Sequence, residues 1–176
     1  MPPVTAAMLR TDRLDLVPLG PGHADEMAAV LADPALHAFT GGAPDTADAL
    51  RARYARLAAG SPDPAVAWGN WALRLRADGR LAGYVQATVG PDTAELAWVV
   101  GTPWQGRGLA AEAARAVLGH LRAAGTTTVL AHIHPDHPAS AAVARSLGLA
   151  PTDERQDGEV RWRLVLTEQP EPPERS

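Results

Sequence analysis

The chain has no cysteine and no lysine, and each absence excludes a class of chemistry. Without cysteine there is no disulfide framework, no thiol nucleophile and no thiolate ligand for a metal. Without lysine there is no phosphate loop of the nucleoside triphosphatase type, whose glycine-rich turn ends on that residue. All 16 basic residues are arginine, which we attribute to GC-rich codon usage and not to mechanism.

Strong charge and long apolar runs are missing as well. The formal net charge is -4, and like charges do not cluster, whereas a nucleic-acid-binding protein usually carries a basic face. No apolar segment reaches the length that crosses a membrane, and the first residues lack the pattern of a signal peptide. We therefore expect a cytoplasmic protein that binds neither nucleic acid nor membrane.

The length of 176 residues fits one domain with a sizeable core. We place this domain at residues 1–167. The remaining "EQPEPPERS", residues 168–176, is rich in proline and charge and almost free of apolar side chains. Such a composition cannot bury enough surface to offset the entropy of ordering, so it predicts a disordered tail.

Apolar periodicity predicts a strand, two helices, three strands, a helix, a strand, a helix and a final pair of strands. The strand signals lie at residues 12–19, 70–90, 92–101, 126–134 and 155–166, and the helix signals at 20–33, 45–60, 106–125 and 137–150. Asp78-Gly79 and Asp157-Gly158 are typical of hairpin turns. This order predicts an α/β (α+β) domain, with helices packed on a mixed sheet.

The most regular helix, at residues 106–125, opens on Gly106-Arg107-Gly108 and ends at Gly125. Its apolar face follows the helical period and comprises Leu109, Ala110, Ala113, Ala114, Val117, Leu118 and Leu121. A helix N-terminus presents unpaired N–H groups and a positive dipole end, which attract anions. The two glycines would let a diphosphate approach the backbone, and Arg107 adds a cation. The opening therefore predicts a site for a phosphorylated ligand.

Two other interpretations of this opening stay open on the residues alone. Gly106, Gly108 and Ala111 approximate a dinucleotide fingerprint, although antiparallel-looking strands precede them instead of a strand-helix-strand unit. The glycines could also serve only the tight packing of a loop against a helix.

The stretch "VVGTPWQGRGLAAEA", residues 99–113, resembles the acyl-CoA-binding signature of the GNAT superfamily, the GCN5-related N-acetyltransferases. Gln105, Gly108 and Ala110 match its pattern of Q/R-x-x-G-x-G/A. "LRTDRLDLVPL" and "HPDHPASAAVARSLGLAP" resemble the first strand and a late helix of the branch that contains the ribosomal-protein N-terminal acetyltransferases. The likeness covers nearly the whole chain, and a bacterial source is part of the expectation.

The resemblance implies a twisted, mostly antiparallel sheet of about seven strands that splays between the fourth and fifth. It implies acetyl-CoA as cofactor, with its pantetheine arm along the backbone of Val99 and Val100. The diphosphate is expected on Gln105, Gly106, Arg107, Gly108, Leu109 and Ala110. His137 stands where the branch usually has Asn against the coenzyme. A homodimer is compatible with the family.

For catalysis, the resemblance implies direct attack of a primary amine in a ternary complex. The expected roles are general base for Glu95, oxyanion donor for the backbone N–H near Val100, and general acid or sulfur ligand for Ser140. A tyrosine that many relatives carry a few residues after Ser140 is absent. The acceptor, a peptide N-terminus or a small amine, is expected against His37, Phe39, Trp68 and Trp71.

Three alternatives accompany this interpretation. Because His137 and the missing tyrosine depart from the pattern, the chain could be a non-catalytic acyl-CoA sensor or interaction module. The dinucleotide fingerprint would instead make it an oxidoreductase. His132, His134 and His137 with Asp136 could bind zinc, although the acyl-CoA cleft accounts for the same segment without a metal.

Overall fold

A computed structural model describes residues 7–39 and 41–166, so the predicted tail lies outside the described residues. The strands are β1 (Leu9–Arg10), β2 (Leu14–Pro18), β3 (Ala67–Leu75), β4 (Leu81–Val89), β5 (Thr93–Val100), β6 (Thr128–Ile133), β7 (Ala150–Gln156) and β8 (Glu159–Val165). The α-helices are α1 (Ala24–Val30), α2 (Ala47–Ala59), α3 (Leu109–Ala123) and α4 (Pro138–Ser146), with short 3-10 turns at Pro21–His23, Pro34–His37 and Thr102–Trp104.

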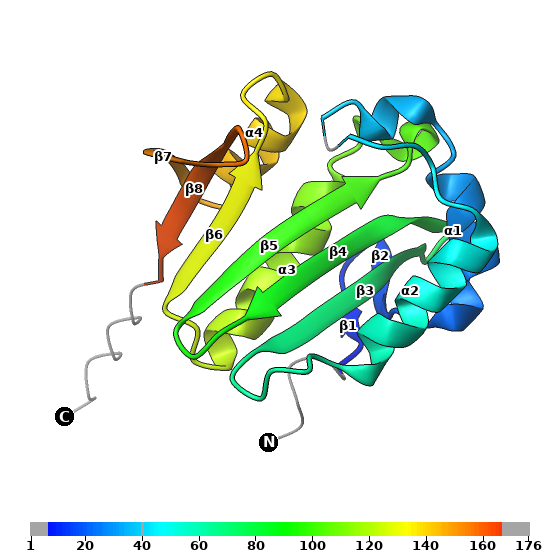
Figure 1. Cartoon of the computed structure of the whole chain (residues 1–176), viewed down its shortest axis with the longest axis horizontal. Helices are drawn as coiled ribbons and strands as arrows, with labels where there is room; N and C mark the ends of the chain where they lie inside the picture. The colour runs from blue at the N-terminus through cyan, green and yellow to red at the C-terminus, as the bar shows by residue number, and fades with distance from the viewer. Residues whose placement is uncertain (1–6, 40, 167–176) are drawn as a thin grey trace.

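The strands form one sheet in the order β1-β2-β3-β4-β5-β6-β8-β7, in which only β5 and β6 run parallel (Figure 1). The predicted mixed, mostly antiparallel sheet is confirmed. It has one more strand than expected, because the two residues of β1 pair with β2. Both predicted hairpin turns are present: Gly79 and the Asp157-Gly158 pair have positive φ, as such turns require.

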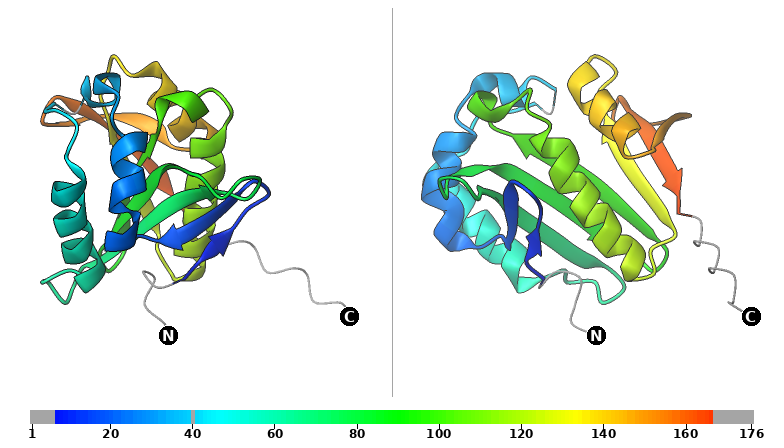
Figure 2. Two further views of the ribbon diagram at one scale, coloured as in Figure 1. Left: turned by 90° about the vertical axis from the view of Figure 1, so that its right-hand side faces the viewer. Right: turned by 180° about the vertical axis from the view of Figure 1, so that it is seen from behind.

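Two apolar layers cover the two faces of the sheet. Helix α3 crosses the rear face and buries the stripe that its sequence predicts, with Ala110 half-buried at its margin (Figure 2). Helices α1 and α2 cover β3 and β4 on the opposite face. Gly125, with φ of 97°, follows α3 as the predicted stop. In the described part of the chain, no helix is long and apolar enough to cross a bilayer.

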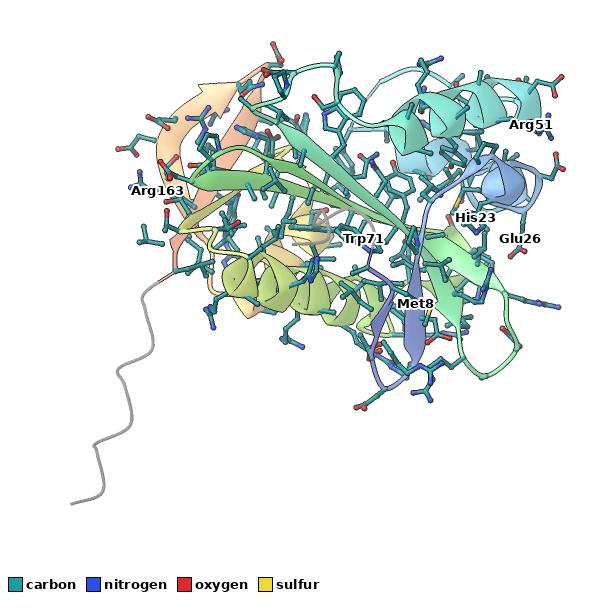
Figure 3. The ribbon with its side chains drawn as sticks, turned by 90° about the horizontal axis from the view of Figure 1, so that it is seen from below. Met8, His23, Glu26, Arg51, Trp71 and Arg163 are labelled. Atoms are coloured by element: carbon teal, nitrogen blue, oxygen red, sulfur yellow. The ribbon has the colours of Figure 1, made fainter. Side chains whose placement is uncertain are left out.

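Trp71 belongs to the core and not to an acceptor site. Its side chain is fully buried between the sheet and α3, and its indole N–H donates to the Ala7 carbonyl at 2.8 Å (Figure 3). Trp68 lies three residues earlier on the same strand. Because side chains alternate along a strand, an odd spacing puts the two rings on opposite faces. The expectation that both line one acceptor site is therefore wrong.

Two histidines accept backbone N–H groups at helix starts. His23 Nδ1 accepts from Gly20 at 3.0 Å, and His137 Nδ1 accepts from Ser140 at 3.2 Å, which makes His137 the N-cap of α4. Burial lowers the pKa of both imidazoles, with Arg74 adding to the effect at His23 and His134 at His137. Protonation would remove the acceptor lone pair, so the native fold requires both rings neutral at these bonds.

This requirement predicts a pH dependence of stability. The folded-state pKa values lie below the unfolded value of about 6.5, so the unfolded chain binds more protons in that range. The stabilisation is complete above that value and is lost as pH falls through the folded values. We expect the urea midpoint to drop between pH 7.5 and 5.5. His137→Asn, which keeps a capping acceptor that does not titrate, should flatten the drop; an identical slope in the variant would contradict the assignment.

Candidate active site

Strands β5 and β6 share only three register pairs, from Thr93 with Thr128 to Glu95 with Leu130, and then diverge (Figure 1). The resemblance implies a splay between the fourth and fifth strands, and the divergence of β5 from β6 is that splay. A cleft of about 550 Å³ opens there, lined by β5, β6, the start of α3 and the start of α4. Phe39 reaches it from the segment after α1, and its ring lies 4.5 Å from the ring of His137.

The register of β5 determines which backbone groups face the gap. The Gly90 N–H donates to the Thr93 carbonyl, and the Gly101 N–H donates to the Ala82 carbonyl. These two bonds identify the hydrogen-bonded residue pairs at the two ends of the ladder between β4 and β5. By alternation, Val99 bonds to β4, whereas Trp98 and Val100 present their N–H and C=O groups towards β6. The backbone that pairs with the pantetheine arm was expected at Val99 and Val100. The register instead leaves the backbone of Trp98 and Val100 facing the gap. Gln105 caps this backbone edge by donating Nε2–H to the Val100 carbonyl at 2.9 Å.

The Gly-Arg-Gly opening offers a row of unpaired donors. The first helical bond of α3 runs from Glu112 N–H to the Gly108 carbonyl, and no described residue accepts from the N–H groups of residues 106–111. The Gln105 N–H, which was expected to join them, donates instead to Thr102. Gly106 and Gly108 hold φ of 77° and 76°, and a Cβ on Gly106 would meet only open space. These residues fit a diphosphate, which needs many donors and little steric bulk.

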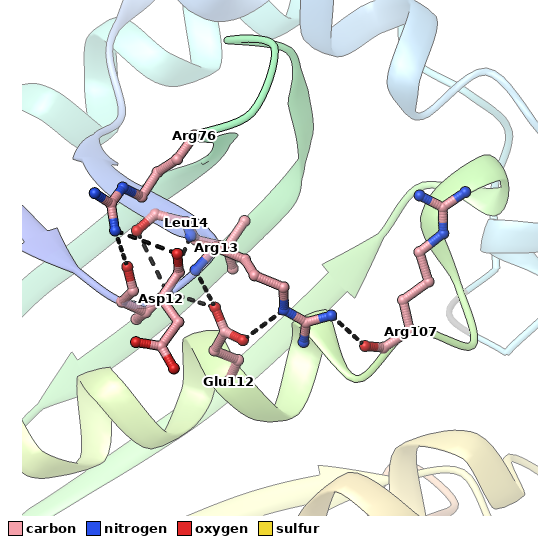
Figure 4. A network of polar contacts seen from close by, with 7 residues as sticks. Asp12, Arg13, Leu14, Arg76, Arg107 and Glu112 are labelled. Atoms are coloured by element: carbon pink, nitrogen blue, oxygen red, sulfur yellow. Dashed lines mark hydrogen bonds and ion pairs between the residues drawn. The ribbon is translucent and has the colours of Figure 1, made fainter.

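A polar network from the turn between β1 and β2 holds the Gly-Arg-Gly turn in place (Figure 4). Glu112 accepts from the Thr11 hydroxyl at 2.6 Å and from Arg13 Nε at 2.8 Å, and Arg13 also donates to the Arg107 carbonyl at 2.8 Å. Burial raises the pKa of Glu112, but the hydrogen bonds from Thr11 and Arg13 outweigh it and lower the pKa overall. The Arg107 side chain is exposed and does not line the cleft. Arg107 therefore contributes to the turn through its backbone carbonyl and not through its charge.

Glu95 lies at the last paired rung, where the cleft begins, and lines it. Its Oε1 accepts from His132 Nδ1 at 2.7 Å. The ring of His132 in turn accepts at Nε2 from Arg161 Nε, at 3.1 Å. The sequence placed His132 only in a zinc alternative. The described residues contain no group of three or more candidate ligands, and both nitrogens of His132 are already engaged, so zinc does not fit.

Ser140 also lines the cleft, at the start of α4. Its Oγ is 3.4 Å from His137 Nε2, while His137 Nδ1 accepts the Ser140 N–H. A neutral ring that accepts at Nδ1 carries its proton on Nε2 and donates it to the hydroxyl oxygen. The hydroxyl proton of Ser140 is then free to point into the cleft. His137 thus serves as the N-cap of α4, and its expected contact with the coenzyme stays a prediction.

A second, smaller cavity of about 140 Å³ adjoins the cleft on the α1 and α2 side. The two spaces share Leu36, Tyr84, Gln86 and Val99. His37 lines the small cavity, Phe39 lines the cleft, and neither Trp68 nor Trp71 contributes to them. Asp45 and Arg53 form an ion pair at 2.9 Å on its wall. Burial raises the pKa of the Tyr54 and Tyr84 hydroxyls, so both stay neutral donors.

Comparison with known proteins agrees with this geometry. A family model described as "Acetyltransferase (GNAT) domain" matches residues 13–150. A protein described as a GnaT-family acetyltransferase from Bordetella pertussis has 28% identity and a TM-score of 0.68, covering 89% of this chain and 97% of its own. The acetyltransferase from Agrobacterium tumefaciens has 25% identity and a TM-score of 0.71, with 91% and 95% covered.

The ribosomal-protein acetyltransferase RimL, solved in complex with coenzyme A, has 16% identity and a TM-score of 0.75 over 91% of this chain and 98% of its own. At that identity the likeness shows the fold. No curated protein sequence matches the chain. The domain match spans well over half of the chain, and the cleft between β5 and β6 has the donors that an acyl-CoA diphosphate needs: the chain belongs to the GNAT acetyltransferases and uses acetyl-CoA.

Proposed function

We propose that this protein transfers the acetyl group of acetyl-CoA to a primary amine within a ternary complex. The observation that carries the proposal is the position of Glu95. Glu95, Val99, Tyr84 and Gln86 lie on one face of the sheet, because paired residues on neighbouring strands share a face. The small cavity opens on that same face, so the carboxylate is directed to the side from which an acceptor can enter.

Acetyl-CoA supplies an activated acyl carbon and a thiol leaving group. The N–H groups of residues 106–111 would hold its diphosphate, and the backbone of Trp98 and Val100 its pantetheine arm. Glu95 takes a proton from the acceptor ammonium, directly or through one water, and so leaves a neutral nucleophile. The Val100 N–H is the donor for the acyl oxygen. Ser140 donates a hydrogen bond from its hydroxyl to the departing sulfur, and the released thiolate takes its proton from solvent.

The small cavity supports a peptide N-terminus as the acceptor, with its first side chain in this space. RimL is described as an α-N-protein acetyltransferase, which is consistent with this choice. The walls are leucines, and the polar end holds Tyr54, Tyr84 and the Asp45–Arg53 pair. A first residue with a small side chain that ends in oxygen, such as serine, suits both the leucine walls and the polar end of the cavity. Tyr54 is 3% exposed, and its hydroxyl has no hydrogen-bond partner among the described residues.

Gly108→Asp should abolish acetyl-CoA binding in calorimetric titration, because it puts a carboxylate against the diphosphate. Gly125→Asp is the matched control, since Gly125 has a similarly positive φ of 97° at the other end of α3. The control should bind as the wild type does. Unchanged binding by Gly108→Asp would contradict the diphosphate site, and loss in both variants would point to the fold of α3.

Glu95→Gln should lower kcat by about 10²- to 10⁴-fold, the usual contribution of a general base, while acetyl-CoA affinity stays the same. Glu159→Gln is the matched control, because Glu159 also lines the cleft. Steady-state kinetics with an acceptor peptide measure both variants. If Glu159→Gln lost activity and Glu95→Gln kept it, the assignment of the base would be wrong.

Tyr54→Phe should raise KM for a peptide that begins with serine by about 3- to 10-fold, the value of one hydrogen bond. KM for the same peptide beginning with alanine should not change, and neither should KM for acetyl-CoA. N-acetylated peptides serve as controls that present no amine. An equal change for the serine and alanine peptides would show that Tyr54 does not read the first side chain.

A further inference from the structure

Four side chains, one from each of β5, β6, β8 and β7, form a continuous chain of hydrogen bonds beside the cleft. Glu95 contacts His132 at 2.7 Å, and His132 contacts Arg161 Nε at 3.1 Å. Arg161 continues through its Nη1 to Glu154 at 2.8 Å. The side chain of His132, in the middle, is 7% exposed, whereas that of Glu95 is 47% exposed. The buried ring therefore connects the open carboxylate to a fixed guanidinium.

The direction of each bond follows from the donors available. Arg161 can only donate, so His132 Nε2 must carry a lone pair towards it. The ring proton is then on Nδ1 and is donated to Glu95 Oε1. His132 has no free lone pair left and cannot serve as the base itself. Glu95 keeps Oε2 free, so the carboxylate is held by one oxygen and reacts through the other.

We propose that His132 and Arg161 are positioning residues for Glu95, an inference that rests on the proposed function. Arg161 fixes His132 as the neutral Nδ1–H tautomer, because a second ring proton on Nε2 would face the guanidinium. The neutral ring orients the carboxylate without neutralising its charge. A protonated ring would instead form an ion pair with Glu95 and weaken its ability to accept a proton from the acceptor.

The surroundings of His132 are mixed in charge. Glu95 faces it from β5 and Arg161 from β8, with Glu154 of β7 behind the guanidinium. Glu159 of β8 also lines the cleft, and His134, which follows the last residue of β6, lies two residues from His132. Arg161 is the cation that directly contacts the ring, so its removal is the most direct perturbation.

The tautomer can be observed without turnover, by ¹⁵N-detected correlation of the histidine rings. His23, His134 and His137 accept backbone N–H groups at Nδ1, so each must be an Nε2–H tautomer when neutral. At pH 8, His132 should give an Nδ1–H signal that disappears in His132→Asn. In Arg161→Met, which removes the donor that faces Nε2, the ring should lose this fixed tautomer and an Nε2–H signal should appear. An Nε2–H or doubly protonated His132 in the wild type would overturn the proposal.

The kinetic test is the pH profile of kcat. In Arg161→Met the acidic limb should move to higher pH, because removal of a cation beside Glu95 and His132 favours their protonated forms, while kcat at pH 8 should change little. Arg163→Met is the control, because it removes the same charge two residues away on the same face of β8. Its profile should not move.

The double variant His132→Asn/Arg161→Met separates the ring from the charge. It has no titrating ring at this position, so its acidic limb should return to that of the wild type. If the shift persisted, the lost arginine charge would be acting on Glu95 directly and His132 would have no part in it. A wild-type protein without any turnover would contradict the proposed function, whereas the ring signals would still decide the tautomer.

Discussion

The separation of β5 from β6 after three register pairs is the constraint on which the rest of the structure depends. A continued ladder would satisfy the backbone of Trp98 and Val100 and leave no cleft. Because the strands part at Glu95, the backbone of Trp98 and the N–H of Val100 remain available to a ligand, and the carboxylate lies where the gap begins. The Gly-Arg-Gly turn lies beyond the open end of β5, held by the network of Glu112 and Arg13. One divergence thus accounts for the proposed arm site, the proposed diphosphate site and the proposed position of the base.

The sheet also separates the two proposed substrate sites. Helix α3 packs on the face where Leu96 and Val100 are buried, and its N-terminus supplies the donors for the diphosphate. The small cavity lies on the other face, beside α1 and α2. Alternation along β5 therefore directs Glu95 towards the face of the small cavity, the proposed acceptor side, while the neighbouring backbone faces the gap. Because successive side chains of a strand point to opposite faces, β5 alone can direct its side chains to both sites.

Much of this could be predicted from local sequence. The stripe of α3, the stop at Gly125 and the two hairpin turns each depend on residues close together in the chain, so periodicity and turn chemistry suffice. The pairing of β1 could not be predicted, because two residues carry no period. Trp68 and Trp71 are close in sequence, but their odd spacing along β3 directs their rings to opposite faces of the sheet. The chain from Glu95 through His132 to Arg161 joins three strands across more than sixty positions, and no local signal predicts such a contact.

The most direct test of the central claim is amide hydrogen exchange, resolved by residue, with and without coenzyme A. Binding should slow exchange at Trp98, at Val100 and at residues 106–111, because these N–H groups have no partner among the described residues. Val99, which already bonds to β4, should not change. Protection that alternated in this way along β5 would support a ligand seated between the separated strands. Protection of Val99 instead of its neighbours, or none along β5, would contradict the account.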